Sequence, residues 1–150
     1  MTEPTLTGGC QCGAVRYALS RLPRYASICH CRMCQRATGQ PFAAFAGVRT
    51  EELTWTRGKP SIFRSSNVAE RGFCADCGTP LTYAFDGSGE ISVSMGSLDD
   101  PEIMAPEKQY GIESKLFWCA SLETLPGERT DEWWPAAITV ASRQKPDRTS

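Results

Sequence analysis

Residues 74–78 read Cys-Ala-Asp-Cys-Gly, a Cys-x-x-Cys turn that is followed by a glycine. Such a turn points two sulfurs at one spot, and backbone N–H groups can face those sulfurs, while the glycine relieves the turn that follows. Zinc takes four ligands in a tetrahedron, so one pair of cysteines supplies half of a closed site. The rest of the chain must supply the other half, and its position decides how the chain folds.

The cysteines fall into three tight groups and one single residue. The eight cysteines of this 150-residue chain are Cys10, Cys12, Cys29, Cys31, Cys34, Cys74, Cys77 and Cys119. We find no export signal, and in a reducing compartment closely spaced thiols bind a metal more often than they form disulfides. The chain has one histidine, so any metal site must consist mainly of thiolates.

The number of sulfurs indicates how they divide between two metal ions. The first and last groups together supply four thiolates, which is a saturated and therefore structural site. Its ligands are Cys10, Cys12, Cys74 and Cys77. The middle group supplies three thiolates and an open position, which is the layout of a catalytic metal. Its ligands are Cys29, Cys31 and Cys34. The other division, two sulfurs of the middle group with one of the pairs, leaves ligands unused.

Two further residues have less direct interpretations. His30 lies between two of the expected ligands, and adjacent residues usually point in opposite directions. We favour a local hydrogen-bonding role for it over a role as ligand or base. Cys119 is distant from the three groups, and it is the one thiol left that could complete the middle site. Its apolar neighbours indicate a small buried side chain instead.

Short stretches rich in β-branched and aromatic residues, separated by glycine and proline, predict a mostly β fold. The expected strands are residues 14–19, 42–45, 53–55, 61–63, 81–85 and 91–95. A hairpin turn is expected at residues 86–89, which read Asp-Gly-Ser-Gly. Residues 32–38, stopped by Gly39, predict one short helix. We expect Trp133 and Trp134 to fold back on the core, and residues 141–150 to be disordered.

Length and charge exclude several classes of protein. The chain has one domain's worth of residues, and 16 Lys and Arg against 17 Asp and Glu give a net charge of −1. This balance argues against a bulk nucleic-acid binder. No apolar run approaches the ~20 residues of a membrane helix, and residues 1–9 lack the pattern of a signal peptide. We expect a cytoplasmic protein, monomeric or homodimeric, that binds no nucleic acid and no membrane.

Three segments together resemble the glutathione-dependent formaldehyde-activating enzyme (GFA) family. They are residues 9–17 (GCQCGAVRY), 29–36 (CHCRMCQR) and 71–81 (RGFCADCGTPL). The resemblance implies a single-domain, tent-like antiparallel β-sheet zinc fold with little helix. Its parts are an N-terminal tail (1–6), a GFA-type zinc-binding domain (7–127) and a C-terminal extension (128–150) whose end is disordered.

The same resemblance implies an activity and its cofactors. It implies two zinc ions per chain, a structural one on the first and last cysteine groups and a substrate-side one on the middle group. A zinc ion with three protein ligands is bound more weakly than one with four, so the second site can be partly empty. The implied enzyme is a zinc-dependent carbon–sulfur lyase that resembles S-(hydroxymethyl)glutathione synthase. Its partners are a glutathione-like thiol and an aldehyde, formaldehyde in the family's named reaction, and Cys29, Cys31 and Cys34 carry the catalysis.

The sequence also offers candidate residues for substrate binding and is compatible with two functions other than an enzyme. The two carboxylates of glutathione need cationic or N–H partners. The candidates are Arg32, Arg36, Arg64 and Lys115. Gln109 stands where many relatives carry a histidine, which leaves the identity of the substrate open. The alternatives to an enzyme are a non-catalytic, zinc-stapled binding module and a thiol redox protein, in which the middle cysteines exchange between disulfide and metal-bound forms.

Overall fold

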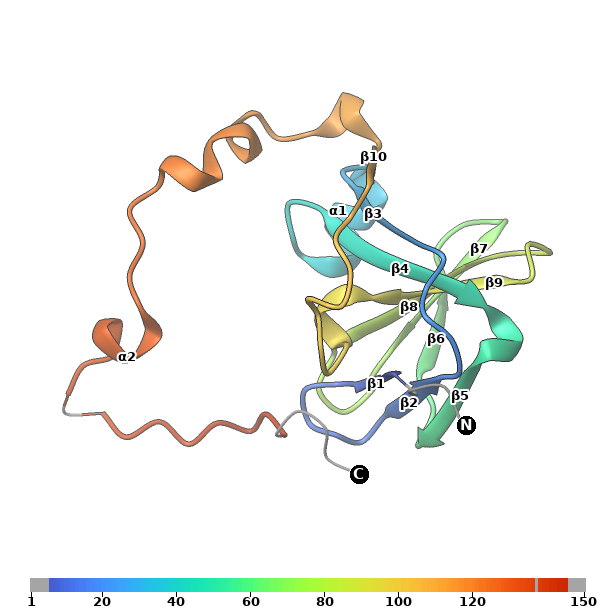
Figure 1. The fold of residues 1–150 in the computed structure, drawn as a ribbon, viewed down its shortest axis with the longest axis horizontal. Coiled ribbons are helices and arrows are strands. Elements are labelled where there is room, and N and C mark those ends of the chain that lie inside the picture. Colours follow the sequence, from blue (N-terminus) through green and yellow to red (C-terminus); the bar gives the residue numbers. More distant parts are fainter. Residues whose placement is uncertain (1–5, 137, 146–150) are drawn as a thin grey trace.

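The computed structural model describes residues 6–136 and 138–145, and ten strands in this part of the chain form two sheets. The smaller sheet has the order β1-β2-β5, with β1 (Leu6–Gly9), β2 (Arg16–Leu19) and β5 (Leu53–Arg57). The larger sheet has the order β10-β3-β4-β9-β8-β7-β6. Its strands are β3 (Tyr25–Cys29), β4 (Ala43–Arg49), β6 (Ser61–Arg64), β7 (Ala69–Phe73), β8 (Pro80–Phe85), β9 (Glu90–Ser94) and β10 (Lys108–Tyr110). The prediction of a mostly β, single-domain fold is confirmed (Figure 1).

Helices are few and short in the described residues. They are α1 (Arg32–Thr38) and α2 (Thr130–Trp133), with the 3₁₀ turns η1 (Thr50–Glu52), η2 (Met95–Ser97), η3 (Ile112–Ser114) and η4 (Phe117–Thr124). The predicted helix, α1, has the expected bounds, and Gly39 ends it with a φ of 67°. Only glycine adopts this left-handed conformation without steric cost, which is why the helix stops there.

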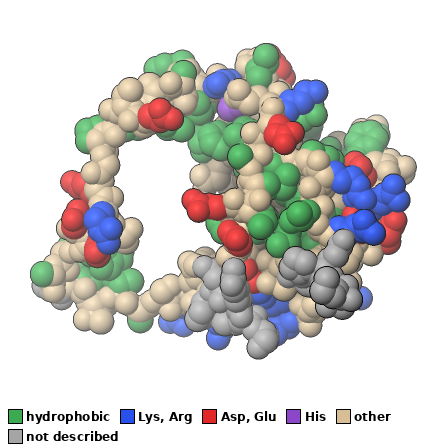
Figure 2. Space-filling model, in the orientation of Figure 1, with side chains coloured by type: hydrophobic (Ala, Val, Ile, Leu, Met, Phe, Trp, Pro, Cys, Tyr) green, Lys and Arg blue, Asp and Glu red, His purple; other side chains and the backbone are tan. Residues whose placement is uncertain are grey.

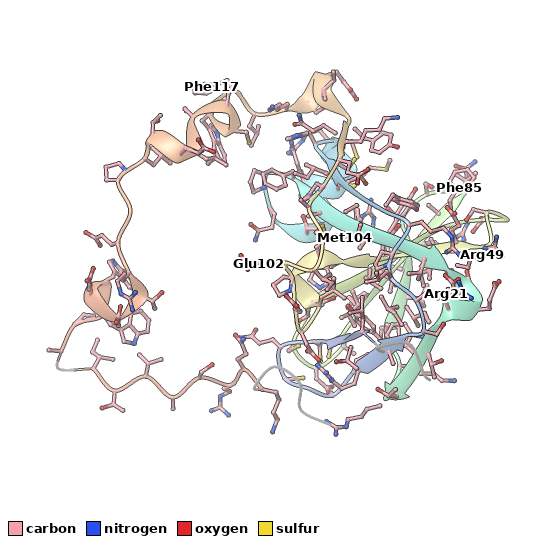
Figure 3. The ribbon with its side chains drawn as sticks, in the orientation of Figure 1. Arg21, Arg49, Phe85, Glu102, Met104 and Phe117 are labelled. Carbon is pink, nitrogen blue, oxygen red and sulfur yellow. The ribbon has the colours of Figure 1, made fainter. Side chains whose placement is uncertain are left out.

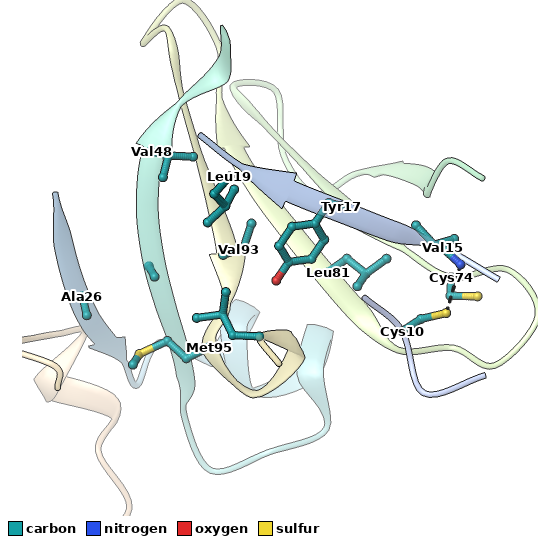
Figure 4. Close-up of a cluster of buried hydrophobic side chains, with 12 residues drawn as sticks. Cys10, Val15, Tyr17, Leu19, Ala26, Val48, Cys74, Leu81, Val93 and Met95 are labelled. Carbon is teal, nitrogen blue, oxygen red and sulfur yellow. Dashed lines mark hydrogen bonds between the residues drawn. The ribbon is translucent and has the colours of Figure 1, made fainter. Parts of the chain in front are cut away.

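The core lies between the two sheets. Tyr17 and Leu19 on β2, Leu81 on β8 and Val93 on β9 are fully buried and belong to one apolar cluster (Figure 4). The hydroxyl of Tyr17 pairs with the Ser97 hydroxyl at 2.7 Å, which satisfies the polar end of this ring inside the cluster. Strand alternation therefore places one face of the small sheet against the large one.

One strand departs from the antiparallel pattern that we expected. β10 pairs with β3 in parallel, with Lys108 opposite Ser27 and Tyr110 opposite Cys29. Parallel neighbours need a long connection, and the chain reaches β10 only after passing through β4 to β9. The pairing places residues 109–115 beside the end of β3, where the middle cysteine group begins.

Beyond η3 the chain forms an arm, residues 116–136 and 138–145, which curves away from the two sheets and returns to β1 and β2 (Figure 1). The space-filling view shows an opening between the arm and the sheets (Figure 2). Phe117, on the arm, is 91% exposed (Figure 3). At its end the backbone N–H of Lys145 donates to the Gln11 carbonyl at 2.9 Å.

The arm overturns two expectations. Trp133 and Trp134 do not fold back on the core: they are exposed, and their rings pack on each other with centroids 4.9 Å apart. Cys119 is half-buried in η4 rather than buried, because the arm has no core of its own. Of the tail expected to be disordered, residues 141–145 have neither helix nor strand, and residues 146–150 lie outside the described part.

No described helix is long and apolar enough to cross a membrane.

An ion pair with two hydrogen bonds ties η1 to the segment before β3. The guanidinium of Arg24 donates to both carboxylate oxygens of Glu52 at 2.6 and 2.7 Å, and the backbone N–H of Arg49 donates to the same carboxylate at 2.9 Å. These donors, Arg24 first, lower the pKa of Glu52 from 4.5 to about 2. The folded state therefore favours the ionised carboxylate more than the unfolded chain does.

We expect Glu52→Gln to lower the melting temperature at pH 7. Because the folded pKa lies below the unfolded value, the contribution of Glu52 is complete above pH 4.5 and is lost as the pH falls toward about 2. Scanning calorimetry of both proteins at matched pH measures the difference in Tm, in which shared acid effects cancel. The control is Glu51→Gln, since exposed Glu51 meets Arg49 only at 3.8 Å. A difference that stays constant with pH contradicts the assignment.

Candidate metal centres

The first and last cysteine groups meet where the two sheets meet. Cys10 and Cys12 lie in the turn between β1 and β2, and Cys74 and Cys77 lie in the turn between β7 and β8. Their four sulfurs lie within 4.8 Å of one another. One pair comes from the small sheet and the other from the large sheet, so an ion held by all four joins the sheets at the edge of the core (Figure 4).

The spacing of these sulfurs suits a tetrahedral metal ion. The Cys10 and Cys12 sulfurs are 3.6 Å apart, and those of Cys12 and Cys74 are 3.8 Å apart. A tetrahedron with Zn–S bonds of about 2.3 Å has edges of about 3.8 Å. The backbone N–H of Val15 also donates to the Cys10 sulfur at 3.2 Å. The four-sulfur group is therefore compatible with zinc in both ligand type and spacing.

The turn around Cys77 favours the thiolate form that a metal needs. Burial raises the pKa of this thiol, but hydrogen bonds from the Thr79 hydroxyl and from backbone N–H groups outweigh burial and lower the pKa to about 6. The Thr79 hydroxyl lies 3.2 Å from the Cys77 sulfur. The N–H of Gly78 donates to the Cys74 carbonyl at 2.8 Å, and the glycine has a φ of 80°. The glycine thus closes the turn as its position in the sequence predicts.

The middle cysteine group is carried by the junction of β3 and α1. Cys29 is the last residue of β3, Cys31 is the N-cap of α1, and Cys34 lies in the first turn of that helix. Their three sulfurs also lie within 4.8 Å of one another. The backbone N–H of Cys34 donates to the Cys31 sulfur at 3.4 Å, so the helix N-terminus supports the group. Burial raises the pKa of Cys29 to about 12.

A cavity of about 530 Å³ opens over the three sulfurs. Its wall includes all three cysteines, four serines (Ser27, Ser65, Ser66 and Ser92) and two tyrosines (Tyr83 and Tyr110). A second cavity of about 630 Å³, between α1 and strands β6 to β8, shares four wall residues with the first. The shared residues are Met33, Phe45, Ser65 and Arg71. Three sulfurs at the wall of a cavity leave room for a ligand that the protein does not supply.

Arg71 on β7 is a site residue that the sequence reasoning did not identify. Its Nη2 donates to the Cys34 sulfur at 3.3 Å, and its Nε donates to the Ser65 hydroxyl at 2.8 Å. Its guanidinium carbon lies 5.0 Å from the centre of the Tyr83 ring. Arg71 is 37 residues from Cys34, so no local spacing joins them. No strand is expected over residues 69–73, so no local pattern in the sequence indicates that Arg71 faces the sulfurs.

Hydrogen bonds of His30, Gln35 and Gln109 hold together the segments next to the three-sulfur group. The Gln109 Oε1 accepts from Lys115 Nζ at 3.2 Å and lies 2.9 Å from the buried His30 Nε2, so His30 donates to it. The Gln35 amide donates to the carbonyls of His30 and Ser114 at 2.8 and 3.0 Å. These bonds tie η3 to the start of α1. The role of His30 is thus a local hydrogen-bonding one.

The four cationic candidates divide into two pairs. Arg32 and Arg36 lie on exposed positions of α1 and line the second cavity. Arg64 instead forms two hydrogen bonds with the Asp86 carboxylate, at 2.8 and 2.7 Å, and does not line either cavity. Lys115 is exposed and donates to Gln109, outside both cavities. The structure therefore brings Arg32 and Arg36 toward the three-sulfur region and leaves the other two cations apart from it.

Gly111 lets β10 and η3 approach the middle cysteine group. Its φ is 64°, and a Cβ placed on it would lie 2.6 Å from the Cys31 nitrogen and 2.9 Å from the Cys31 Cβ. We expect Gly111→Ala to cost about 2 kcal/mol or more through backbone strain and this clash. That corresponds to a Tm lower by roughly 4–8 °C. The displaced segment should also weaken metal binding at the three-sulfur group only.

Gly87 provides the matched control for this substitution. Its φ is 72°, and nothing lies within 4 Å of a Cβ placed on it. Gly87→Ala therefore carries the backbone strain without the clash, and it should retain both metal ions. Thermal melting and elemental analysis of the two variants give the comparison. Equal metal content in both variants contradicts the role given to Gly111.

Three comparisons relate this chain to known proteins. The profile of the glutathione-dependent formaldehyde-activating enzyme family matches residues 5–118. An uncharacterized lyase of Schizosaccharomyces pombe is 34% identical over 83 residues, which are 55% of this chain and 59% of that protein. The chain thus spans somewhat more than half of the length of this relative. A crystal structure of a Rhodobacter sphaeroides protein matches with a TM-score of 0.55 and 26% identity, covering 69% of this chain and 98% of that one.

Proposed function

Because the chain belongs to the glutathione-dependent formaldehyde-activating enzyme family, we propose that it is a carbon–sulfur lyase for the adduct of a glutathione-like thiol and formaldehyde. The observation that carries this proposal is the group of three sulfurs at a cavity wall, one ligand short of a tetrahedron. The similarity to a protein named as a lyase supports the reaction class.

The two cysteine groups have different roles in this proposal. Cys10, Cys12, Cys74 and Cys77 hold a structural zinc ion. Cys29, Cys31 and Cys34 hold a second zinc ion next to the substrate. When bound there, zinc supplies an open coordination position that favours the thiolate form of a substrate thiol at neutral pH. In the direction of synthesis the substrate sulfur forms a bond to the formaldehyde carbon, and the carbonyl oxygen takes up the proton that the thiol has lost. The lyase reaction is the reverse of this step.

The residues of the cavity position the substrate for this reaction. The hydroxymethyl oxygen of the adduct needs a hydrogen-bond partner while charge develops on it. The buried residues Ser27 and Ser92 line the cavity, and their hydroxyls are the proposed partners. Arg32 and Arg36 on the wall of the adjoining cavity provide cations for the carboxylates of a glutathione-like thiol. A reducing compartment such as the cytoplasm suits a chain with seven clustered thiols.

The test is a formaldehyde-exchange measurement with the zinc-loaded protein. Carbon-13 NMR of labelled formaldehyde and glutathione reports the rates at which S-hydroxymethylglutathione forms and breaks down. We expect acceleration over the uncatalysed rate, saturation with glutathione and no acceleration after chelation of the metal. The variant Cys119→Ser, which alters only a thiol on the arm, should retain the full rate. A protein with both metal ions and no acceleration is a binding module and contradicts the proposal.

A further inference from the structure

Arg71 is a buried cation for which the described residues offer no carboxylate partner. Its exposed fraction is 9%, and none of the ion pairs among these residues includes it. A buried charge without an opposite charge is strongly unfavourable. By contrast Arg16, equally buried, has Asp99 as its partner. The charge that stabilises Arg71 must therefore come from another kind of group.

The surroundings of Arg71 identify that group. Its polar neighbours are the Ser65 hydroxyl, which is neutral, and the Cys34 sulfur at 3.3 Å. The Tyr83 ring covers one face of the guanidinium and adds an attraction without a net charge. Glu90 lines the same cavity, but its hydrogen-bond partner there is the Tyr25 hydroxyl at 3.4 Å. The three-sulfur group is thus the anion that faces Arg71.

The charges balance when a divalent metal occupies this group. Three thiolates and one divalent ion have a net charge of −1, and the guanidinium brings the sum to zero. A fourth ligand that is itself anionic then enters a neutral site rather than a negative one. An opposite charge within about 4–6 Å favours an ionised group by about 10- to 1000-fold. A neutral fourth ligand gains nothing comparable from the guanidinium.

We propose that Arg71 selects an anionic fourth ligand at the three-sulfur metal centre by neutralising the charge of its thiolates. This inference rests on the part of the proposed function that places a divalent metal on Cys29, Cys31 and Cys34. It goes further because it assigns the preference for a thiolate to a residue that does not bind the metal. Arg71 lines both cavities and donates to the Cys34 sulfur, which keeps the guanidinium near a ligand that enters beside the sulfurs.

The test compares an anionic with a neutral ligand on the cobalt(II)-loaded protein. The probes are 2-mercaptoethanol, which binds as a thiolate and has no carboxylate, and imidazole, which binds neutral. Dissociation constants come from the change in the visible cobalt absorption bands at constant pH and ionic strength. The variants are Arg71→Met, Arg71→Gln and Arg71→Lys. The control is Arg49→Met, an exposed arginine that is 3.8 Å from Glu51 and lines neither cavity.

We expect the Met and Gln variants to bind the thiol at least about tenfold more weakly and imidazole within about twofold of the unaltered protein. The Lys variant, which keeps the charge, should stay within about threefold for both ligands. Loss of the second cobalt ion from both neutral variants but not from Arg71→Lys also supports the inference, because it shows the same need for charge. The inference would be overturned if the neutral variants lost affinity equally for both ligands or for neither. Loss of the metal from all three variants would overturn it as well.

This result is independent of turnover. The titrations contain no aldehyde, so a protein that binds thiols with this charge preference but has no lyase activity contradicts only the proposed function. An active lyase whose thiol affinity does not depend on Arg71 contradicts only the inference. The cobalt content before titration shows whether the metal centre itself is present in each variant.

Discussion

Cys31→Ser is expected to lower the zinc content from two ions per chain to one and to abolish lyase turnover, while the protein stays folded. Cys31 is one of the three proposed ligands, and removal even of a residue that only supports a ligand costs about 10–100-fold in affinity or activity. We therefore expect a loss of at least about 100-fold in rate. Elemental analysis and the formaldehyde-exchange assay measure the two effects.

The fold should survive this change for a local reason. Cys31 is the N-cap of α1, where its side chain accepts a hydrogen bond from the Cys34 N–H. Serine is among the best residues at an N-cap, so the hydroxyl can replace the sulfur as acceptor. The Tm should therefore change little, and Cys119→Ser, the matched control, should change neither metal content nor rate. A Cys31→Ser protein with two zinc ions and full activity contradicts the account.

Cys74→Ser is expected to have the opposite result, a large loss of stability. Cys74 is 1% exposed, belongs to the main apolar cluster and lies in the group of sulfurs that joins the two sheets. Structural zinc sites contribute about 10–16 kcal/mol in small peptides, and a whole domain has a stability of about 5–15 kcal/mol. The loss of the scaffold ion is therefore comparable with the entire stability of the domain.

We expect Cys74→Ser to melt about 10–20 °C lower or to accumulate as insoluble protein, which corresponds to a loss of about 5 kcal/mol or more. Thermal melting and metal analysis of the soluble fraction give the result. The comparison with Cys31→Ser is direct, since both changes replace one sulfur by one oxygen. Equal effects of the two substitutions on Tm would show that the four-sulfur group does not stabilise the fold more than the three-sulfur group.

The sequence predicts much of this architecture because its signals are local. The six expected strands correspond to β2, β4, β5, β6, β8 and β9, and the hairpin turn lies where Asp86 to Gly89 place it. Four strands are not predicted from the sequence, namely β1, β3, β7 and β10. The strand β1 has two glycines among four residues, and β7 has adjacent charges in Glu70 and Arg71. The pairing of such strands with their neighbours in the sheet, rather than their own composition, makes them strands.

The candidate site shows the same division between local and long-range information. The two groups of sulfurs that the sequence predicts are the two that the structure brings together, because the spacing within each turn and the number of ligands that zinc needs can both be read from the sequence. The contact between Arg71 and Cys34 depends on how β7 lies relative to α1, which no spacing in the chain reveals. Arg64, with the same charge, lies on a neighbouring strand and instead pairs with Asp86. Which arginine faces the sulfurs is thus decided by the sheet.

In the proposed arrangement, one sulfur group is saturated and the other accepts a ligand from outside the protein. Cadmium-113 NMR of the cadmium-substituted protein tests it directly, because cadmium shares the preference of zinc for thiolates. We expect two resonances, of which one moves when glutathione is added and is absent from Cys31→Ser, while the other stays unchanged. Two resonances that both ignore glutathione, or a single resonance in the unaltered protein, would contradict it.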